Sequence, residues 1–311
     1  MATALPQRLL CVALCLCFAA MAQARAQSAG DDEALTLDDV VVVAERATTA
    51  TKTDTALIET PQAISVVPSE LSEERGARNL QETLRYSAGV TAEAFGLDTR
   101  GEVISIRGLD PVQYLDGMRK VYNFNPLPRT EVYGLDRVEV LRGPSSMLYG
   151  AASAGGVVNA ISKRPSFRNG GEVGIQYGSF DRKQAQFDVT AGLNEADTLA
   201  GRIVGVYRDS GMQTDHLADD REFLAPSLTW RAGDRTELTF LATWQRDDTA
   251  SSQQFLPVVS TLLASGDRRL DPSTFLGDTG YDRVLAEQRS ARLLAEHPAT
   301  EESFAFLLLV S

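Results

Sequence analysis

Apolar and polar residues alternate along much of the C-terminal half of the chain. Between Gln184 and Ala191, and again between Leu238 and Trp244, every second residue is apolar. A period of two places the apolar side chains on one face of a β-strand. We therefore predict antiparallel strands near residues 172–180, 184–192, 199–209, 221–231 and 236–247, each long enough to cross a thin apolar layer.

The connections between these predicted strands alternate in length. Residues 194–197 and 232–234 read as tight turns, whereas 210–220 and about 248–287 are long polar loops. Short turns at one end and long loops at the other are typical of outer-membrane barrels. A soluble β-sandwich also alternates, so the period alone leaves both architectures open. Beyond about Glu287 the alternation fades.

The middle of the chain, from about Pro61 to Arg164, predicts a mixture of strands and short helices. The apolar runs at 63–67, 103–106, 138–141 and 157–161 read as strands. A short helix is expected over 79–87, because Asn79 has the position of an N-cap and a glutamate follows three residues later. This zone is therefore expected to fold separately from the alternating one.

The first 26 residues have the features of a secretory signal. Arg8 supplies a positive charge, residues 9–20 are apolar, and Ala24-Arg25-Ala26 is a cleavage site of the A-x-A type. A buried N-terminal helix is the structural alternative. We predict an exported protein whose mature chain begins near Gln27, although a cut after Ala22 also fits.

Composition narrows the chemistry of this exported chain. All three cysteines lie inside the predicted signal, and the chain has only two histidines. No disulfide framework, thiol nucleophile or bound metal is therefore expected, and no cofactor. The net charge of −12 argues against nucleic acid as a partner. No later segment has 18 consecutive apolar residues, so no transmembrane helix is predicted.

A series of motifs in the middle zone resembles the plug-domain signatures of one family, the TonB-dependent outer-membrane receptors of the ferric-siderophore type. The resemblance extends to about Arg246, and the stretch from Gln176 to Asp181 is similar to the start of the barrel in that subgroup. The plug motifs are Ile104-Ser105-Ile106-Arg107-Gly108, Tyr114-Leu115-Asp116-Gly117, Asp136-Arg137-Val138-Glu139-Val140-Leu141-Arg142-Gly143-Pro144, Leu148-Tyr149-Gly150, Gly155-Gly156-Val157-Val158-Asn159 and Ser162-Lys163-Arg164-Pro165.

The resemblance implies a fold. It is an α+β plug domain followed by the first strands of an antiparallel transmembrane β-barrel, which has about 22 strands in the complete family. We divide the chain into a signal peptide (1–26), a flexible N-terminal segment (27–60), the plug (61–165) and the N-terminal part of a barrel (166–311). The last residue is Ser311 rather than an aromatic residue. We therefore expect a truncated form of the receptor.

The same resemblance implies a function. It is uptake of ferric-siderophore complexes into the periplasm across the outer membrane of a Gram-negative bacterium, with outer-membrane lipid as a partner if the barrel is complete. The chain is not expected to be an enzyme, because no nucleophile elbow or metal triad is present. The alternatives are a non-transporting plug fragment, a periplasmic binding module, or a receptor for another cargo such as cobalamin.

Two sets of residues are implied for coupling and closure. Asp39, Val40, Val41, Val42 and Val43 look like a TonB box, an extended segment that adds as a strand to the energy-transducing partner TonB. An ordinary first plug strand is the alternative. The second set is Arg107 and Arg142, each directly after an apolar strand. By resemblance they pair with glutamates of the barrel wall, and snorkelling at a strand end is the alternative.

The glycine-rich run and the ligand site complete the expectations. Gly155 and Gly156 permit close backbone approach inside a plug. A phosphate-binding loop over 150–155 is the rival interpretation, but it lacks the Lys-Ser/Thr that such loops carry. Iron held by a siderophore needs no metal ligands from the receptor. By resemblance to hydroxamate receptors the ligand-binding candidates are Arg100, Gln113, Tyr122 and Phe124, and surface-loop residues without a ligand role are equally compatible with the pattern.

Overall fold

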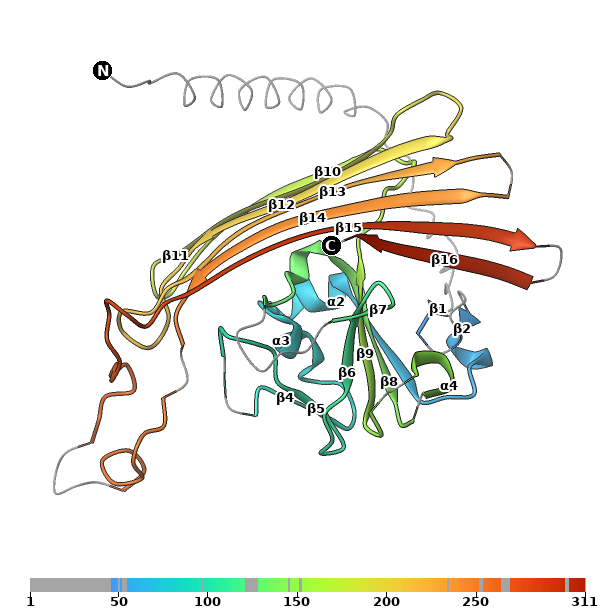
Figure 1. Cartoon of the computed structure of the whole chain (residues 1–311). Coiled ribbons are helices and arrows are strands. Elements are labelled where there is room, and N and C mark those ends of the chain that lie inside the picture. The colour runs from blue at the N-terminus through green and yellow to red at the C-terminus, as the bar shows by residue number, and fades with distance from the viewer. Residues whose placement is uncertain are drawn as a thin grey trace, which may run out of the picture. The chain divides into compact units, whose positions relative to one another are not determined.

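The computed structural model of the chain (Figure 1) divides into two units, residues 1–43 and 44–311, and the residues that the structure describes lie in the second. No helix in this part is long and apolar enough to cross a membrane. The described residues are 46–49, 51, 55–94, 96, 98–120, 128–144, 146–150, 153–233, 235–251, 254–263, 269–299 and 302–310.

A five-stranded sheet forms the centre of the region that precedes the alternating zone. β8 pairs antiparallel with β3 and β9, whereas β6 lies parallel to β9. The apolar residues of β8 and β9 are buried, which confirms the two strands predicted there. We call this sheet with its helices the plug. Its strands, in sheet order, are β3 (Ile64–Pro68), β8 (Leu135–Arg142), β9 (Gly156–Ser162), β6 (Val112–Leu115) and β7 (Met118–Arg119).

Two short helices, α2 (Ser69–Glu74) and α3 (Leu80–Leu84), belong to the plug. Leu80 and Leu84 of α3 are buried in the same core as Val138 and Val140 of β8. The Asn79 side chain accepts a hydrogen bond from the Glu82 backbone N–H at 2.8 Å, which confirms the predicted N-cap. The helix ends at Leu84, earlier than the sequence predicted.

The rest of the plug consists of short elements around this sheet. Residues 46–49 and 55–60, which fall in the segment predicted to be flexible, are ordered and include β1, β2 and η2. Gly156 adopts a φ of +124°, and a Cβ there would lie 2.0 Å from the Leu141 carbonyl oxygen, so only glycine fits. The short elements are β1 (Arg46–Ala47), β2 (Thr55–Ala56), η2 (Leu57–Glu59), β4 (Val90–Ala92), β5 (Ile104–Ile106), η3 (Val132–Gly134) and α4 (Ser146–Tyr149).

A seven-stranded antiparallel sheet, which we call the wall, follows the plug (Figure 1). Every strand pairs with the next one along the chain. The five strands predicted from the alternation are all present, within about two residues of the expected bounds. The wall strands are β10 (Gly170–Gly178), β11 (Arg182–Gly192), β12 (Leu199–Asp209), β13 (Asp219–Arg231), β14 (Glu237–Thr249), β15 (Val284–Ala299) and β16 (Glu302–Val310).

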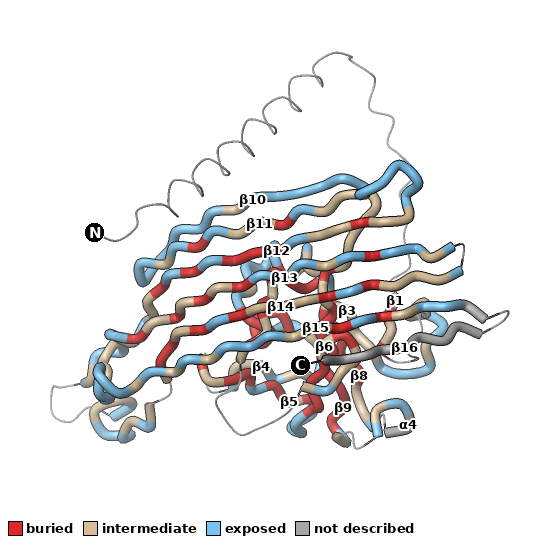
Figure 2. Tube along the Cα trace, turned by 45° about the horizontal axis from the view of Figure 1, so that its top comes forward, coloured by how far each residue is buried: buried red, intermediate tan, exposed pale blue. Residues whose placement is uncertain are grey.

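The two faces of the wall differ in exposure. Along β12, Val204 and Val206 are buried on the face toward the plug, whereas Ile203 and Tyr207 are exposed on the other face. Figure 2 shows buried and exposed residues interleaved along the wall strands. An outer face of exposed apolar and aromatic side chains is the pattern of a membrane-facing barrel surface.

β15 continues well past Glu287, where the alternation in the sequence fades. Its pairing with β14 is unbroken from Val284 to Glu296. The pattern fades because Ser290 and Arg292 face the plug, while Glu287 and Arg289 point to the exposed side. Polar residues therefore occupy both faces of this strand, and only its backbone pairing identifies it.

Candidate functional site

A network of buried charges joins the plug to the wall. Glu131, at the start of η3, accepts hydrogen bonds through Oε2 from Nη2 of Arg208 at 2.9 Å and from Nη1 of Arg221 at 3.0 Å. Arg208 lies near the end of β12 and Arg221 near the start of β13. All three side chains are only 2% exposed. One plug carboxylate thus holds two neighbouring wall strands.

Further ion pairs make this network electrically balanced. Arg129 of the plug pairs with Asp219, and Nη1 of Arg208 lies 3.0 Å from the same carboxylate. Arg221 forms a two-point contact with Asp247, at 2.7 and 2.9 Å. Three arginines therefore meet three carboxylates in a buried setting. Each charge has a partner, so none carries the full cost of an isolated buried ion.

Burial and the two arginines act in opposite directions on Glu131. Burial disfavours its charged form, but Arg208 and Arg221 outweigh this and hold the pKa of Glu131 below its usual range. The carboxylate is therefore ionised at neutral pH. It acts as a fixed negative charge between plug and wall.

A second contact is centred on Asp116 in the Tyr114-Leu115-Asp116-Gly117 motif. Asp116 and Gly117 both have positive φ and turn the chain from β6 into β7, as Asp-Gly pairs favour. The Asp116 carboxylate accepts hydrogen bonds from the Ser162 N–H at 2.7 Å and from the Ser162 hydroxyl at 2.8 Å. It also pairs with Arg292 of β15. The turn motif therefore anchors the plug to the wall.

A third contact lies where the plug continues into the wall. Lys163 follows β9, and its Nζ lies 3.0 Å from Oδ2 of Asp188 on β11. Arg202 on β12 contacts the same carboxylate at 2.6 and 2.7 Å. The Lys163 ammonium also lies 4.4 Å from the centre of the Tyr133 ring, within cation–π range.

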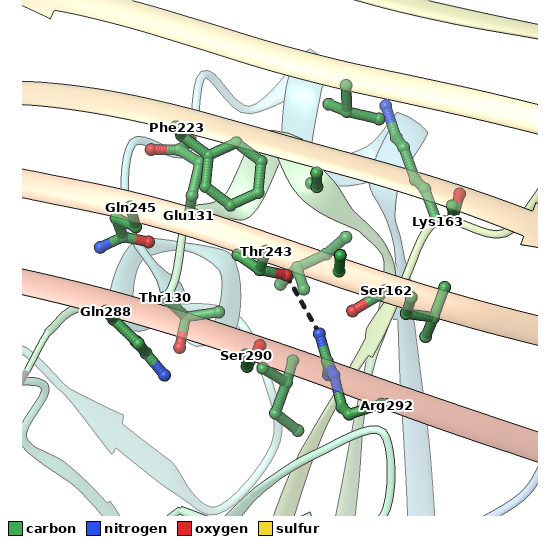
Figure 3. A pocket seen from close by; sticks show the side chains of 18 of the residues that line it. Thr130, Glu131, Ser162, Lys163, Phe223, Thr243, Gln245, Gln288, Ser290 and Arg292 are labelled. Atoms are coloured by element: carbon green, nitrogen blue, oxygen red, sulfur yellow. Dashed lines mark hydrogen bonds between the residues drawn. The ribbon is translucent and has the colours of Figure 1, made fainter. Parts of the chain in front are cut away.

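A small cavity lined by both polar and apolar side chains lies between these contacts (Figure 3). Its volume is about 70 Å³, enough for a few water molecules. Arg292 donates to the Thr243 hydroxyl across it, at 3.2 Å. Nε of Arg292 and the Ser290 hydroxyl have no hydrogen-bond partner among the described residues. These two wall groups are therefore suited to bind water in the cavity.

Apolar contact between plug and wall is concentrated around η3. Tyr133 packs with Val204, Val206 and Phe223 in one buried cluster. Gly134 lies so close to the Phe223 ring that a Cβ at this position would come within 2.7 Å of it. Among the described residues, both ion pairs and this apolar cluster join the plug to the wall.

A separate polar cage holds the residues that follow the predicted TonB box. Glu139 of β8 is fully buried and accepts hydrogen bonds from the backbone N–H of Thr48 at 3.0 Å and of Thr49 at 2.7 Å. Asn159 donates to the Thr49 hydroxyl at 3.0 Å, and the Tyr149 hydroxyl donates to the Thr49 carbonyl at 2.8 Å. We call this arrangement the Thr49 cage.

The two arginines predicted to meet barrel glutamates lie close to each other in the plug. Arg107, with a positive φ, is exposed, and no carboxylate in the described part of the chain forms an ion pair with it. Arg142 donates through Nε to the Ala88 carbonyl at 2.7 Å. Burial, and then the charge of Arg107, lower the pKa of Arg142. The two cations thus repel each other, and their pairing with wall glutamates stays a prediction.

The structure places only part of the predicted ligand site and none of the predicted TonB box. Arg100 forms an ion pair with Asp98 at 3.0 Å. Gln113 is buried and donates to the Glu102 carbonyl at 3.0 Å. Tyr122 and Phe124 lie outside the described residues, as do Asp39, Val40, Val41, Val42 and Val43.

Sequence reasoning missed the plug residues that contact the wall. Asp116 lay inside a quoted motif but received no role, and Arg129 and Glu131 were not singled out. A usable signal was present in the wall. Arg208 follows Val204 and Val206 at the inward positions of an alternating strand, and a buried arginine requires a carboxylate.

The chain matches known proteins over both the plug and the wall. Residues 56–157 match the family model described as "TonB-dependent Receptor Plug Domain". The chain is 35% identical over 267 residues to the ferrioxamine B receptor of Salmonella typhimurium (strain SL1344). It is 32% identical over 226 residues to the ferrichrome outer membrane transporter/phage receptor of Escherichia coli (strain K12).

These alignments cover most of this chain but a minor part of the relatives. They take in 84% and 71% of the chain, but only 38% and 30% of the two relatives. Among solved structures, the pyoverdine outer membrane receptor FpvA from Pseudomonas aeruginosa PAO1, bound to pyoverdine, aligns with a TM-score of 0.74 at 26% identity. That alignment covers 85% of this chain and 39% of the receptor.

Proposed function

We propose that this chain, which belongs to the TonB-dependent receptors, serves the uptake of ferric-siderophore complexes through the outer membrane. The observation that carries the proposal is the ion-paired plug and wall interface around Glu131. Such an interface closes a barrel at rest, and an applied force can separate it, because water replaces the partners of its polar groups. The named relatives, receptors for ferrioxamine B and ferrichrome, support a hydroxamate-type cargo.

In this proposal the residues have three roles. Asp39 to Val43 form the TonB box and add as a strand to TonB. Arg107 and Arg142 close the plug by pairing with carboxylates of the barrel wall, and their mutual repulsion supports this role because it leaves both in need of a counter-charge. We assign the binding of the ferric complex to Arg100, Gln113, Tyr122 and Phe124.

An uptake assay tests the proposal. The gene is expressed at its full encoded length in a strain that lacks other receptors for ferric hydroxamates, and cells are offered a trihydroxamate loaded with radioactive iron. Surface binding is expected with or without TonB, whereas accumulation is expected only with TonB. Cells that bind no more complex than the receptor-free strain would refute the proposal. Carbonate extraction separates it from a periplasmic binding module, because a barrel stays in the membrane fraction.

Substitutions in the predicted box test the coupling. Val41→Pro removes a backbone N–H that strand addition to TonB requires, so accumulation should be lost while surface binding remains. Ala34→Pro places the same residue outside the box and should leave both unchanged. Equal accumulation in the two variants would assign the valines to an ordinary plug strand.

A further inference from the structure

A positively charged pocket lies between the plug and the first hairpins of the wall. Its volume is about 330 Å³, and it is bordered by Arg78 and Arg129 of the plug and by Phe180, Arg182 and Asp219 of the wall. The turn after β10 and the loop after β12 close its outer side. This is the end of the wall that carries the long loops.

The charges around this pocket do not balance. Three arginines line it against one carboxylate. Arg129 is matched by Asp219, and Arg78 is matched by Glu82 behind it. Arg182 donates through Nη2 to the amide oxygen of Gln184 at 2.7 Å, and it pairs with no carboxylate in the described part of the chain. One half-buried guanidinium group is therefore left without a counter-charge.

The neighbouring cavity shows that this imbalance is local. A second cavity of about 340 Å³ shares Arg78 and Arg182, but it also contains Glu73, Glu131 and Glu172. An anion entering from the loop side would meet the arginines first and would be repelled from these carboxylates. The planar guanidinium of Arg182 suits the paired oxygens of a carboxylate or a phosphate.

We propose that this pocket binds an anionic oxygen group through Arg182, and that the group is a carboxylate carried by the ferric complex. The assignment to the cargo rests on the proposed function. The pocket is smaller than a whole siderophore complex and fits one acidic arm of it. The other source of the same chemistry is a phosphate of the surrounding lipid. The receptor would thus prefer ferric complexes with a free carboxylate over their neutral forms.

Titration calorimetry on the purified full-length protein in detergent tests this preference. The probes are a ferric trihydroxamate with one free terminal carboxylate, the methyl ester of the same complex, and inorganic phosphate alone. The free carboxylate should bind about tenfold more tightly than the ester, or about 1.4 kcal/mol. Arg182→Gln should abolish this difference, and Arg182→Lys should keep part of it. Lys183→Gln removes an exposed cation from the next residue and should change nothing.

The outcomes separate the two proposals. Equal affinity of carboxylate and ester for the wild-type protein, with no phosphate binding that depends on Arg182, overturns the pocket. A carboxylate preference that survives Arg182→Gln also overturns it. Phosphate binding lost in Arg182→Gln, without any carboxylate preference, keeps the anion site but assigns it to lipid phosphate. If neither ferric complex binds, the uptake function fails, and phosphate still tests the pocket by itself.

Discussion

Oε2 of Glu139, in the middle of β8, lies 2.7 Å from the backbone nitrogen of Thr49, a residue 90 positions earlier in the chain. The contact is fully buried, and it fixes the N-terminal segment to a central strand of the plug. The predicted TonB box ends six residues before Thr49. A force applied at the box would therefore reach the Thr49 cage before it reached any other part of the plug sheet.

Weakening this cage should loosen the N-terminal segment. Glu139→Gln keeps the size of the side chain but removes its charge and one accepting oxygen. The carboxylate accepts from Thr48 and Thr49 and also from Nε of Arg137 at 2.7 Å, so at least one of these donors loses its partner and Arg137 loses an ion pair. We expect the free energy of unfolding to fall by about 1.5–3 kcal/mol. Hydrogen exchange at Thr48 and Thr49 should also become faster. Glu70→Gln, at an exposed position of α2, is the control, and equal exchange in both variants would argue against the cage.

Removing the plug carboxylate of the buried network should be costly. Glu131→Ala leaves Arg208 and Arg221 with one partner fewer in a buried site, and the expected loss is about 3–5 kcal/mol in the free energy of unfolding. Glu237 pairs with Arg231 at an exposed position, so Glu237→Ala should cost less than about 1 kcal/mol. Denaturant titrations of the two variants measure the contrast. Similar losses would mean that the network contributes no more than a surface pair.

The same glutamate predicts a dependence on acid. Its pKa in the folded protein lies below the unfolded value of about 4.3, so its stabilisation is fully present above that pH. The stabilisation is lost as the pH falls through the lower, folded value. Glu131→Gln should therefore reduce the acid-induced loss of stability. Unfolding curves recorded between neutral pH and about pH 3 measure this, and parallel curves for the two proteins would contradict it.

Glu73 should change the stability with pH in the opposite direction and therefore serves as a control. Its side chain is 49% exposed, and the partial burial raises its pKa despite the nearby Lys163. Its ionisation in the folded protein is therefore unfavourable, and the resulting destabilisation develops as the pH rises from the unfolded pKa through the folded one. Glu73→Gln should be more stable than the wild type above this range and should approach it in acid. A stability difference independent of pH would contradict this assignment.

Two substitutions of Asp116 distinguish the effect of the side-chain charge from the effects of the other contacts and of the backbone geometry of the turn. Asp116 has a φ of +50°, which asparagine tolerates but alanine does not. Asp116→Asn should therefore lose mainly the ion pair with Arg292, whereas Asp116→Ala should lose the pair and both hydrogen bonds from Ser162 and should also strain the turn. The alanine variant is expected to be less stable than the asparagine variant by at least about 1 kcal/mol. Thermal unfolding compares them, and equal stabilities would mean that neither the Ser162 hydrogen bonds nor the positive φ of Asp116 affects the stability of the turn.

Local patterns in the sequence predicted much of the fold. The period of two located β10 to β14, and the N-cap rule located the start of α3. Both depend on neighbouring residues, which a single sequence displays directly. The extent of β15 was not predicted, because Arg292 points inward and Arg289 outward, which removes the alternation. The extent of β15 follows instead from its backbone pairing with β14.

The candidate site was harder to predict than the fold. Glu131 and Arg208 are 77 positions apart, and their meeting depends on how the plug docks against the wall. No local rule selects one pair among the 42 acidic and 30 basic residues of the chain. The family resemblance identified the plug motifs, but it did not assign Asp116 or Glu131 as partners of wall arginines.

The short connection between plug and wall limits how the plug can move. Only residues 163–169 link β9 to β10, and a chain of this length spans at most about 25 Å. Lys163 and Arg164 within it are also tied to Asp188 and Glu296. The C-terminal end of the plug is thus held beside the wall by the chain itself, whereas the N-terminal segment is held by the non-covalent contacts of the Thr49 cage. A displacement that broke those contacts would move the N-terminal part of the plug farther than the end that the linker retains.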